Sequence, residues 1–60
     1  MGEAAIIMYV YDGMVSMTKL YNDEEECIEI YEGADGFDRA FHDACEWGFE
    51  VNTVKTVEMD

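Results

Sequence analysis

The chain contains no proline, and among its 60 residues it has only three basic side chains, two cysteines and one histidine. Fifteen Asp and Glu residues give it a formal net charge of −12 at pH 7. Direct binding of DNA or RNA is excluded, because neutralising phosphates requires clustered Lys and Arg, whereas Lys19, Arg39 and Lys55 stand alone. An anionic membrane surface is excluded on the same ground.

Long hydrophobic runs are also missing. The longest apolar stretch covers residues 4–11, far short of the roughly 20 residues that span a bilayer, and it lacks the basic flank of a signal peptide. Two cysteines do not make a disulfide framework, which favours a reducing compartment. We therefore expect a cytoplasmic protein. Cys27 and Cys45 are expected as separate reduced thiols, one of them filling the core, with a disulfide between them left open.

The chain nevertheless has the composition of a folded protein. Half of its residues are hydrophobic, and they include four Tyr, three Phe and one Trp. A chain of this length buries about 60% of its unfolded surface, which is enough for one small domain over residues 1–60 but leaves little margin. A second copy that covers more apolar surface would add stability, so we expect a homodimer.

The first half of the chain predicts strands. Residues 4–11 are rich in β-branched and aromatic side chains of both parities, which is typical of a strand buried on both faces. Asp12-Gly13 tolerates the positive φ angles of a two-residue hairpin turn, so a second strand should follow over residues 14–21. After an acidic turn at residues 22–26, residues 27–32 predict a third, half-buried strand.

The spacing of apolar residues then changes from every second residue, as in a strand, to about every 3.6 residues, as in a helix. Phe37, Ala40, Phe41 and Ala44 share one stripe, which predicts a helix over residues 36–47. Asp35 precedes it as the expected N-cap, and Gly48 can take the left-handed position that ends a helix. A last strand should run from Phe49 to about Met59, with a bulge or an edge position near Val54 where the apolar parity breaks.

This order of elements predicts an α+β fold, β-β-β-α-β, with a four-stranded and mainly antiparallel sheet in the order 4-1-2-3. The doubly apolar first strand belongs in the centre, and the single helix packs on one sheet face. The other face is then left for a second copy or a partner. We expect its interface residues among the tyrosines Tyr9, Tyr11, Tyr21 and Tyr31.

No motif indicates catalysis, a cofactor or a metal. The chain has no Gly-rich phosphate loop, no Ser-His-Asp order and no Cys-x-x-Cys pair. Asp38, His42 and Glu46 share one helical stripe and offer metal-ligand atoms, but we interpret them as a solvated polar face of the helix. We expect neither an enzyme nor a metal or cofactor site.

The acidic residues are the remaining signal. Six of them, which we take as the partner-binding set, lie between the second turn and the first turn of the helix: Glu25, Glu26, Glu29, Glu32, Asp35 and Asp38. Alternate residues of a strand lie about 6.6 Å apart on one face, comparable with the spacing of phosphates along a nucleic acid strand. The composition resembles that of small phage-encoded inhibitors that imitate nucleic acid.

Two functions follow from these patterns. The first is a non-enzymatic acidic inhibitor or regulator that binds a basic, nucleic-acid-handling protein, such as a CRISPR effector, a restriction enzyme or a repair enzyme. The second is a small homodimeric interaction module whose acidity serves only solubility.

Overall fold

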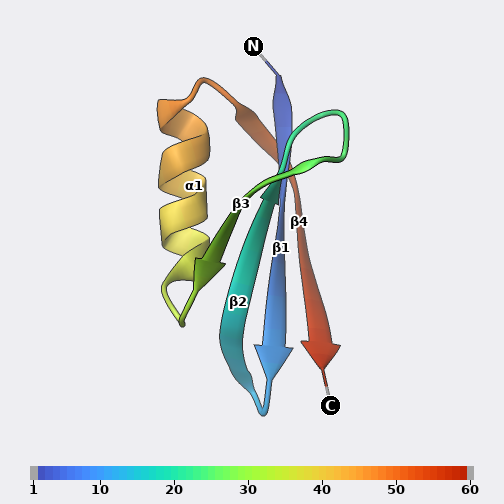
Figure 1. Ribbon diagram of the computed structural model, residues 1–60, viewed down its shortest axis with the longest axis vertical. Coiled ribbons are helices and arrows are strands. Elements are labelled where there is room, and N and C mark those ends of the chain that lie inside the picture. Colours follow the sequence, from blue (N-terminus) through green and yellow to red (C-terminus); the bar gives the residue numbers. More distant parts are fainter. Residues whose placement is uncertain (1, 60) are drawn as a thin grey trace.

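The computed structural model describes residues 2–59 and contains one sheet and one helix. The elements are β1 (Glu3–Tyr11), β2 (Met14–Tyr21), β3 (Cys27–Glu32), α1 (Gly36–Glu46) and β4 (Glu50–Met59). The strands are arranged in the order β3-β2-β1-β4, and α1 lies to one side of them (Figure 1). The predicted α+β class, the element order and the strand order are confirmed.

The sheet is mixed, so the expectation of a mainly antiparallel sheet is corrected. β2 is antiparallel to both β1 and β3, but β4 runs parallel to β1. The reason is the helix, which carries the chain back along the sheet after β3, so that β4 starts at the same end as β1 (Figure 1). β4 is an edge strand with a bulge at Asn52, because Ala4 pairs with Val51 and Ala5 with Thr53.

The predicted turn and helix end are both present. Asp12 and Gly13 have φ angles of 54° and 79°, as a type I′ hairpin requires. Gly48 has a φ of 87°, and its N–H and that of Phe49 donate to the carbonyls of Cys45 and Ala44 at 3.2 and 2.8 Å. These two bonds are those of a Schellman motif. No helix within residues 2–59 is long and apolar enough to cross a membrane.

Other details of the helix differ from the expected pattern. Asp35 occupies the N-cap position, but its side chain makes no capping hydrogen bond. On the expected apolar stripe, Ala40 and Ala44 are buried, whereas Phe41 is 43% exposed. Asp43, which lies off this apolar stripe, is half-buried.

The core is small and lies between α1 and one side of the sheet. Its buried apolar members are Ala4, Ile6, Leu20, Tyr31, Ala40 and Ala44. Gly36 lies directly against the buried Thr18: a Cβ added at Gly36 would be 2.6 Å from the Thr18 hydroxyl oxygen and 2.9 Å from its Cβ. Only glycine allows this approach of the helix to β2.

Tyr31 belongs to this core, and its expected place on the uncovered side of the sheet is wrong. The sheet register pairs Tyr31 with Thr18 and Thr18 with Met8, which places Tyr31 on the side of α1. Tyr31 is only 4% exposed, whereas its strand neighbour Ile30, which points the other way, is 52% exposed.

Thr18 provides a test of this packing. Its hydroxyl is fully buried and has no hydrogen-bond partner among the described residues, an arrangement that costs about 1–3 kcal/mol. Thr18→Val keeps the shape of the side chain and removes the polar group, so we expect the free energy of unfolding to rise by about 1 kcal/mol. Urea unfolding followed by circular dichroism measures it.

Thr56→Val is the matched control, because Thr56 is exposed on β4 and gains the same strand propensity without any change in a buried group. A Thr18→Val protein no more stable than the control would contradict the cost assigned to the buried hydroxyl.

Candidate binding surfaces

The six predicted partner-binding residues are all exposed and lie in the β2–β3 turn, on the outer strand β3 and at the start of α1. We call them the acidic edge: Glu25 and Glu26 in the β2–β3 turn, Glu29 and Glu32 on β3, Asp35 before α1 and Asp38 in its first turn. β3 is the outermost strand on this side, so no neighbouring strand covers these side chains. The structure thus brings four of the six to the β3 border and the start of α1, whereas Glu25 lines a hollow with Asn52 and Lys55 of β4, the opposite outer strand.

Asn22 determines the shape of the turn that carries Glu25 and Glu26. The Asn22 Oδ1 accepts hydrogen bonds from the backbone N–H groups of Glu24 and Glu26, each at 2.9 Å. Backbone bonds of 3.0 Å join Asn22 to Glu25 and Glu26, and Glu25 takes a left-handed φ of 64°. An asparagine before a polar run is a known signal for such a turn, but we did not interpret Asn22 this way from the sequence.

On β3 the carboxylates do not share one face, contrary to the phosphate-like spacing expected from alternate residues. Glu29 and Glu32 are three residues apart, so their side chains leave opposite faces of the strand, about 10 Å apart along it. Glu29 pairs with Leu20 on the helix side, and Glu32 pairs with Met17 on the other side. The acidic edge therefore presents carboxylates around the border rather than in one flat row.

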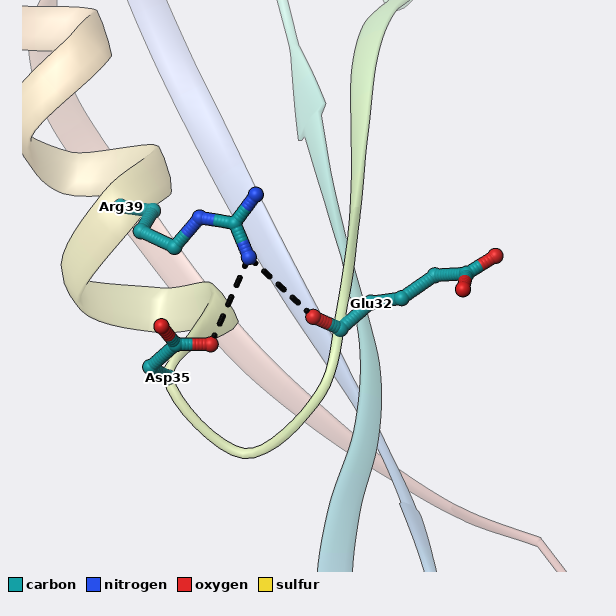
Figure 2. Close-up of polar contacts among 3 residues, drawn as sticks. All are labelled: Glu32, Asp35 and Arg39. Atoms are coloured by element: carbon teal, nitrogen blue, oxygen red, sulfur yellow. Dashed lines mark hydrogen bonds and ion pairs between the residues drawn. The ribbon is translucent and has the colours of Figure 1, made fainter.

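Arg39 engages the part of the acidic edge nearest the helix. Its Nη1 donates to the backbone carbonyl oxygen of Glu32 at 3.3 Å and lies 3.4 Å from the Asp35 Oδ1 (Figure 2). The Glu32 carboxylate itself points away from Arg39 and Asp35 (Figure 2). Asp35 is thus partly neutralised within the chain. Among residues 2–59, no hydrogen bond or ion pair occupies the carboxylates of Glu25, Glu32 or Asp38.

Tyr31 connects β3 to the helix beneath this edge. Its hydroxyl donates to the Asp43 Oδ2 at 2.7 Å, and the Arg39 guanidinium lies over its ring, 5.5 Å from the centroid. Burial, and then the hydrogen bond to Asp43, raise the pKa of Tyr31 above its ordinary value of 10.0. These contacts hold the end of β3 against α1 and fix the direction of the acidic edge.

The second surface is the side of the sheet that faces away from α1. We call it the uncovered face; it includes Ala5, Ile7, Tyr9 and Tyr11 of β1 and the residues paired with them on β2 and β4. Tyr9, Tyr11 and Tyr21 lie here, as expected for three of the four predicted interface tyrosines. A hydrogen bond with Tyr9 raises the pKa of Tyr21, because the two hydroxyls are neighbours on this face.

Two of the three basic residues of the chain lie on the uncovered face, a placement absent from the expectations based on the sequence. Ile7 pairs with Lys19 on one side and with Lys55 on the other. The Lys19 Nζ sits 5.3 Å from the centre of the Tyr9 ring. The signal that could have found them is the strand register, since both lysines share the parity of Ile7 once the strands are aligned.

An open hollow of about 510 Å³ lies where the β2–β3 turn meets the start of β1 and β4. Its lining includes Glu3, Tyr21, Glu25, Asn52 and Lys55, and the Asn52 amide donates to the Glu3 carboxylate at 2.6 Å. Charges of both signs and a wide opening distinguish it from the mostly apolar concave sites of small-molecule ligands.

The other candidate side chains lie apart from these surfaces. Cys27 and Cys45 are free and exposed, so the expectation that one of them fills the core is wrong. On α1, the ligand atoms of His42, Asp43 and Glu46 lie within 4.8 Å of one another. This trio differs from the one weighed in the sequence, and Asp43 already accepts the Tyr31 hydrogen bond.

The chain matches no protein-family model, no curated protein and no solved structure.

The raised pKa of Tyr31 predicts that the stability of the protein depends on pH. Because its folded pKa is raised, the stability that it contributes is complete below pH 10 and is lost as the pH rises further, when the unfolded chain ionises first. Tyr31→Phe should lower the free energy of unfolding by about 0.5–1.5 kcal/mol at neutral pH. It should also reduce the loss of stability above pH 10. Urea unfolding across this pH range measures both effects.

Tyr11→Phe, on an exposed tyrosine of the uncovered face, serves as the control and should leave both quantities unchanged. The assignment fails if Tyr31→Phe loses stability above pH 10 as steeply as the unmodified protein does.

Proposed function

We propose that the protein is a non-enzymatic inhibitor or regulator that binds a basic, nucleic-acid-handling protein through the acidic edge, in the cytoplasm. The observation that carries this proposal is the set of six exposed carboxylates in the β2–β3 turn, on the outer strand β3 and at the start of α1, three of them without a partner among residues 2–59. Target classes with a suitable groove are defence nucleases, including CRISPR effectors and restriction enzymes, repair enzymes and transcription proteins.

The mechanism is competition for a groove that normally holds nucleic acid. Carboxylates of the acidic edge accept charge-assisted hydrogen bonds from Arg and Lys of the target, as phosphate oxygens do. Because Glu29 and Glu32 leave β3 on opposite faces, the border can reach both walls of such a groove. The net charge of −12 adds a long-range attraction that speeds encounter with a basic partner.

The rigidity of the edge supports the same proposal. Ordering a flexible carboxylate-bearing loop upon binding costs free energy. Because the Asn22 hydrogen bonds already order the turn in the free protein, binding of the target does not incur this cost. At the other end of the edge, Arg39 and Tyr31 join β3 to α1. The carboxylates are therefore held at defined positions on a folded border.

A second candidate function is a homodimeric interaction module in which acidity only keeps the protein dispersed. The uncovered face favours it, because Tyr9, Tyr11 and Ile7 lie there without a covering layer. Salt separates the two candidates. Ion pairs with a basic target weaken as ionic strength rises, whereas association of apolar faces does not.

The primary test compares two triple charge reversals. Glu25, Glu32 and Asp38 changed to Lys should weaken target binding by at least about 100-fold, since each lost charge-assisted hydrogen bond is worth about 1.5–3 kcal/mol. Targets are captured from lysate at low and high salt, identified, purified and titrated by calorimetry. A duplex DNA competitor should displace the protein from its target.

The control reverses three exposed carboxylates away from the acidic edge, Glu46, Glu50 and Glu58, and so makes the same change in net charge. Equal loss of binding in both variants would show that overall charge, and not the acidic edge, determines recognition. Binding that persists in the first variant, or that tolerates saturating duplex DNA, would overturn the proposal.

Asn22→Ala tests the shape of the edge without changing its charge. It removes the bonds to the Glu24 and Glu26 N–H groups, so we expect about tenfold weaker target binding from the ordering cost restored to the turn. Asn52→Ala is the matched control, because it removes an amide that bonds Glu3 outside the acidic edge. Calorimetric titration of both variants decides; equal affinities would refute a role for the turn.

A further inference from the structure

The outer border of β3 exposes backbone groups as well as carboxylates. The Gly33 N–H donates to the Ser16 carbonyl oxygen at 3.1 Å and so continues the ladder that joins β3 to β2. In an antiparallel ladder every second residue bonds to the neighbouring strand, so Tyr31 bonds inward as Gly33 does. Glu32 and Ile30 alternate with these residues and therefore direct their N–H and C=O groups away from β2.

Two side-chain contacts agree with this direction. The Ile30 N–H donates to the Glu29 Oε1 at 3.4 Å, and the Arg39 Nη1 donates to the Glu32 carbonyl oxygen at 3.3 Å. Both bonds are long and come from exposed side chains, so a strand with better geometry can replace them. The Ile30 carbonyl and the Glu32 N–H have no partner among residues 2–59.

We propose that an extended segment of the basic target pairs with the free border of β3, antiparallel to it, as an added strand of the sheet. The inference rests on the proposed function and specifies how the acidic edge is recognised. Strand addition supplies main-chain hydrogen bonds to the outward groups of Ile30 and Glu32. Both charged side chains of β3 are carboxylates, so a basic segment is the complementary occupant.

The side chains of β3 indicate which residues the added strand carries. We expect Lys or Arg opposite Glu32 and opposite Glu29, because cross-strand pairs of opposite charge are stabilising. Opposite Ile30, which is 52% exposed, we expect an apolar residue. Opposite Tyr31 we expect an uncharged residue, because Arg39 already lies over the Tyr31 ring. The target segment therefore reads basic, uncharged, apolar, basic from its N-terminal end.

Two other pairings fit the structure less well. A second copy of β3 would bring the carboxylates of both copies to one junction, between two chains that each carry a net charge of −12. β4 is the other outer strand, but the bulge at Asn52 interrupts its border, and Lys55 adds a charge that repels a basic segment.

Ile30→Pro and Ile30→Ala separate the backbone of this border from its side chain. Both variants remove the isoleucine side chain, but only proline removes the outward N–H, and an outer strand tolerates proline where that group faces solvent. The probe is a cyclic β-hairpin peptide with one strand that reads Arg-Thr-Val-Arg, titrated into each full-length variant and followed by NMR. We expect Ile30→Pro to bind it at least about tenfold more weakly than Ile30→Ala does.

Circular dichroism verifies that both variants fold. Equal affinities of the two folded variants would overturn strand addition. If Ile30→Pro unfolds, hydrogen exchange of the unmodified chain decides instead. The N–H groups of Ile30 and Glu32 should exchange at least about tenfold more slowly in the hairpin complex, whereas the amides of β4 should exchange as in the free protein. Unchanged exchange at both residues in the saturated complex would overturn the proposal.

A second hairpin, with Arg-Val-Thr-Arg in the same place, tests the order of the segment. It has the same charge and composition, but its order suits a strand parallel to β3. We expect it to bind about fivefold more weakly or less tightly still. Equal binding of the two hairpins would show attraction by charge alone and overturn the motif, and tighter binding of the second would overturn the antiparallel direction.

The hairpin measurements do not use the target, so their failure is distinct from failure of the proposed function. If neither hairpin binds while reversal of the acidic-edge carboxylates abolishes target binding, strand addition is overturned and the proposed function is retained. If the first hairpin binds as expected while target binding tolerates that reversal, the proposed function is overturned.

Discussion

The contact of Gly36 with Thr18 is the constraint on which the rest of the structure depends. Because glycine has no Cβ, the start of α1 can approach β2 closely enough for Ala40 and Ala44 to reach the core with Ile6 and Leu20. The small alanine side chains keep the helix close along its length. A helix held at this distance covers Tyr31, and with it the β3 residues that support the acidic edge. The whole core is therefore on one side of the sheet.

The basic residues are also divided between the two sides of the sheet. Arg39 is the one basic residue on the helix side, where it contacts Asp35, the Glu32 carbonyl and the Tyr31 ring. Lys19 and Lys55 lie on the uncovered face instead. All charged side chains of β3 and of the β2–β3 turn are therefore carboxylates. The described residues thus separate the carboxylates of β3 and its turn from a face that carries apolar side chains and two lysines.

Local patterns predicted much of this fold. The Asp12-Gly13 turn, the central place of β1 and the helix end at Gly48 each depend on a few neighbouring residues, and the structure confirms them. Neighbouring residues alone do not predict which side chains of β3 face α1. In β3 the apolar Ile30 points outward and Tyr31 inward, where the Tyr31 hydroxyl donates a hydrogen bond to Asp43, twelve residues further along the chain. Likewise, the sequence identifies the acidic set but not the opposite facing of Glu29 and Glu32, which the strand register determines.

The chain has a high hydrophobic content but a small core. Half of the residues are hydrophobic, yet the buried apolar set among residues 2–59 has six members, two of which are alanines of the helix. One helix of eleven residues covers only part of one side of a sheet whose outer strand β4 is ten residues long. Most large apolar side chains therefore remain at the surface, and several gather on the face that α1 does not reach. Composition alone suggests a core that the single helix cannot build, so the surplus apolar surface is available for contact with another chain.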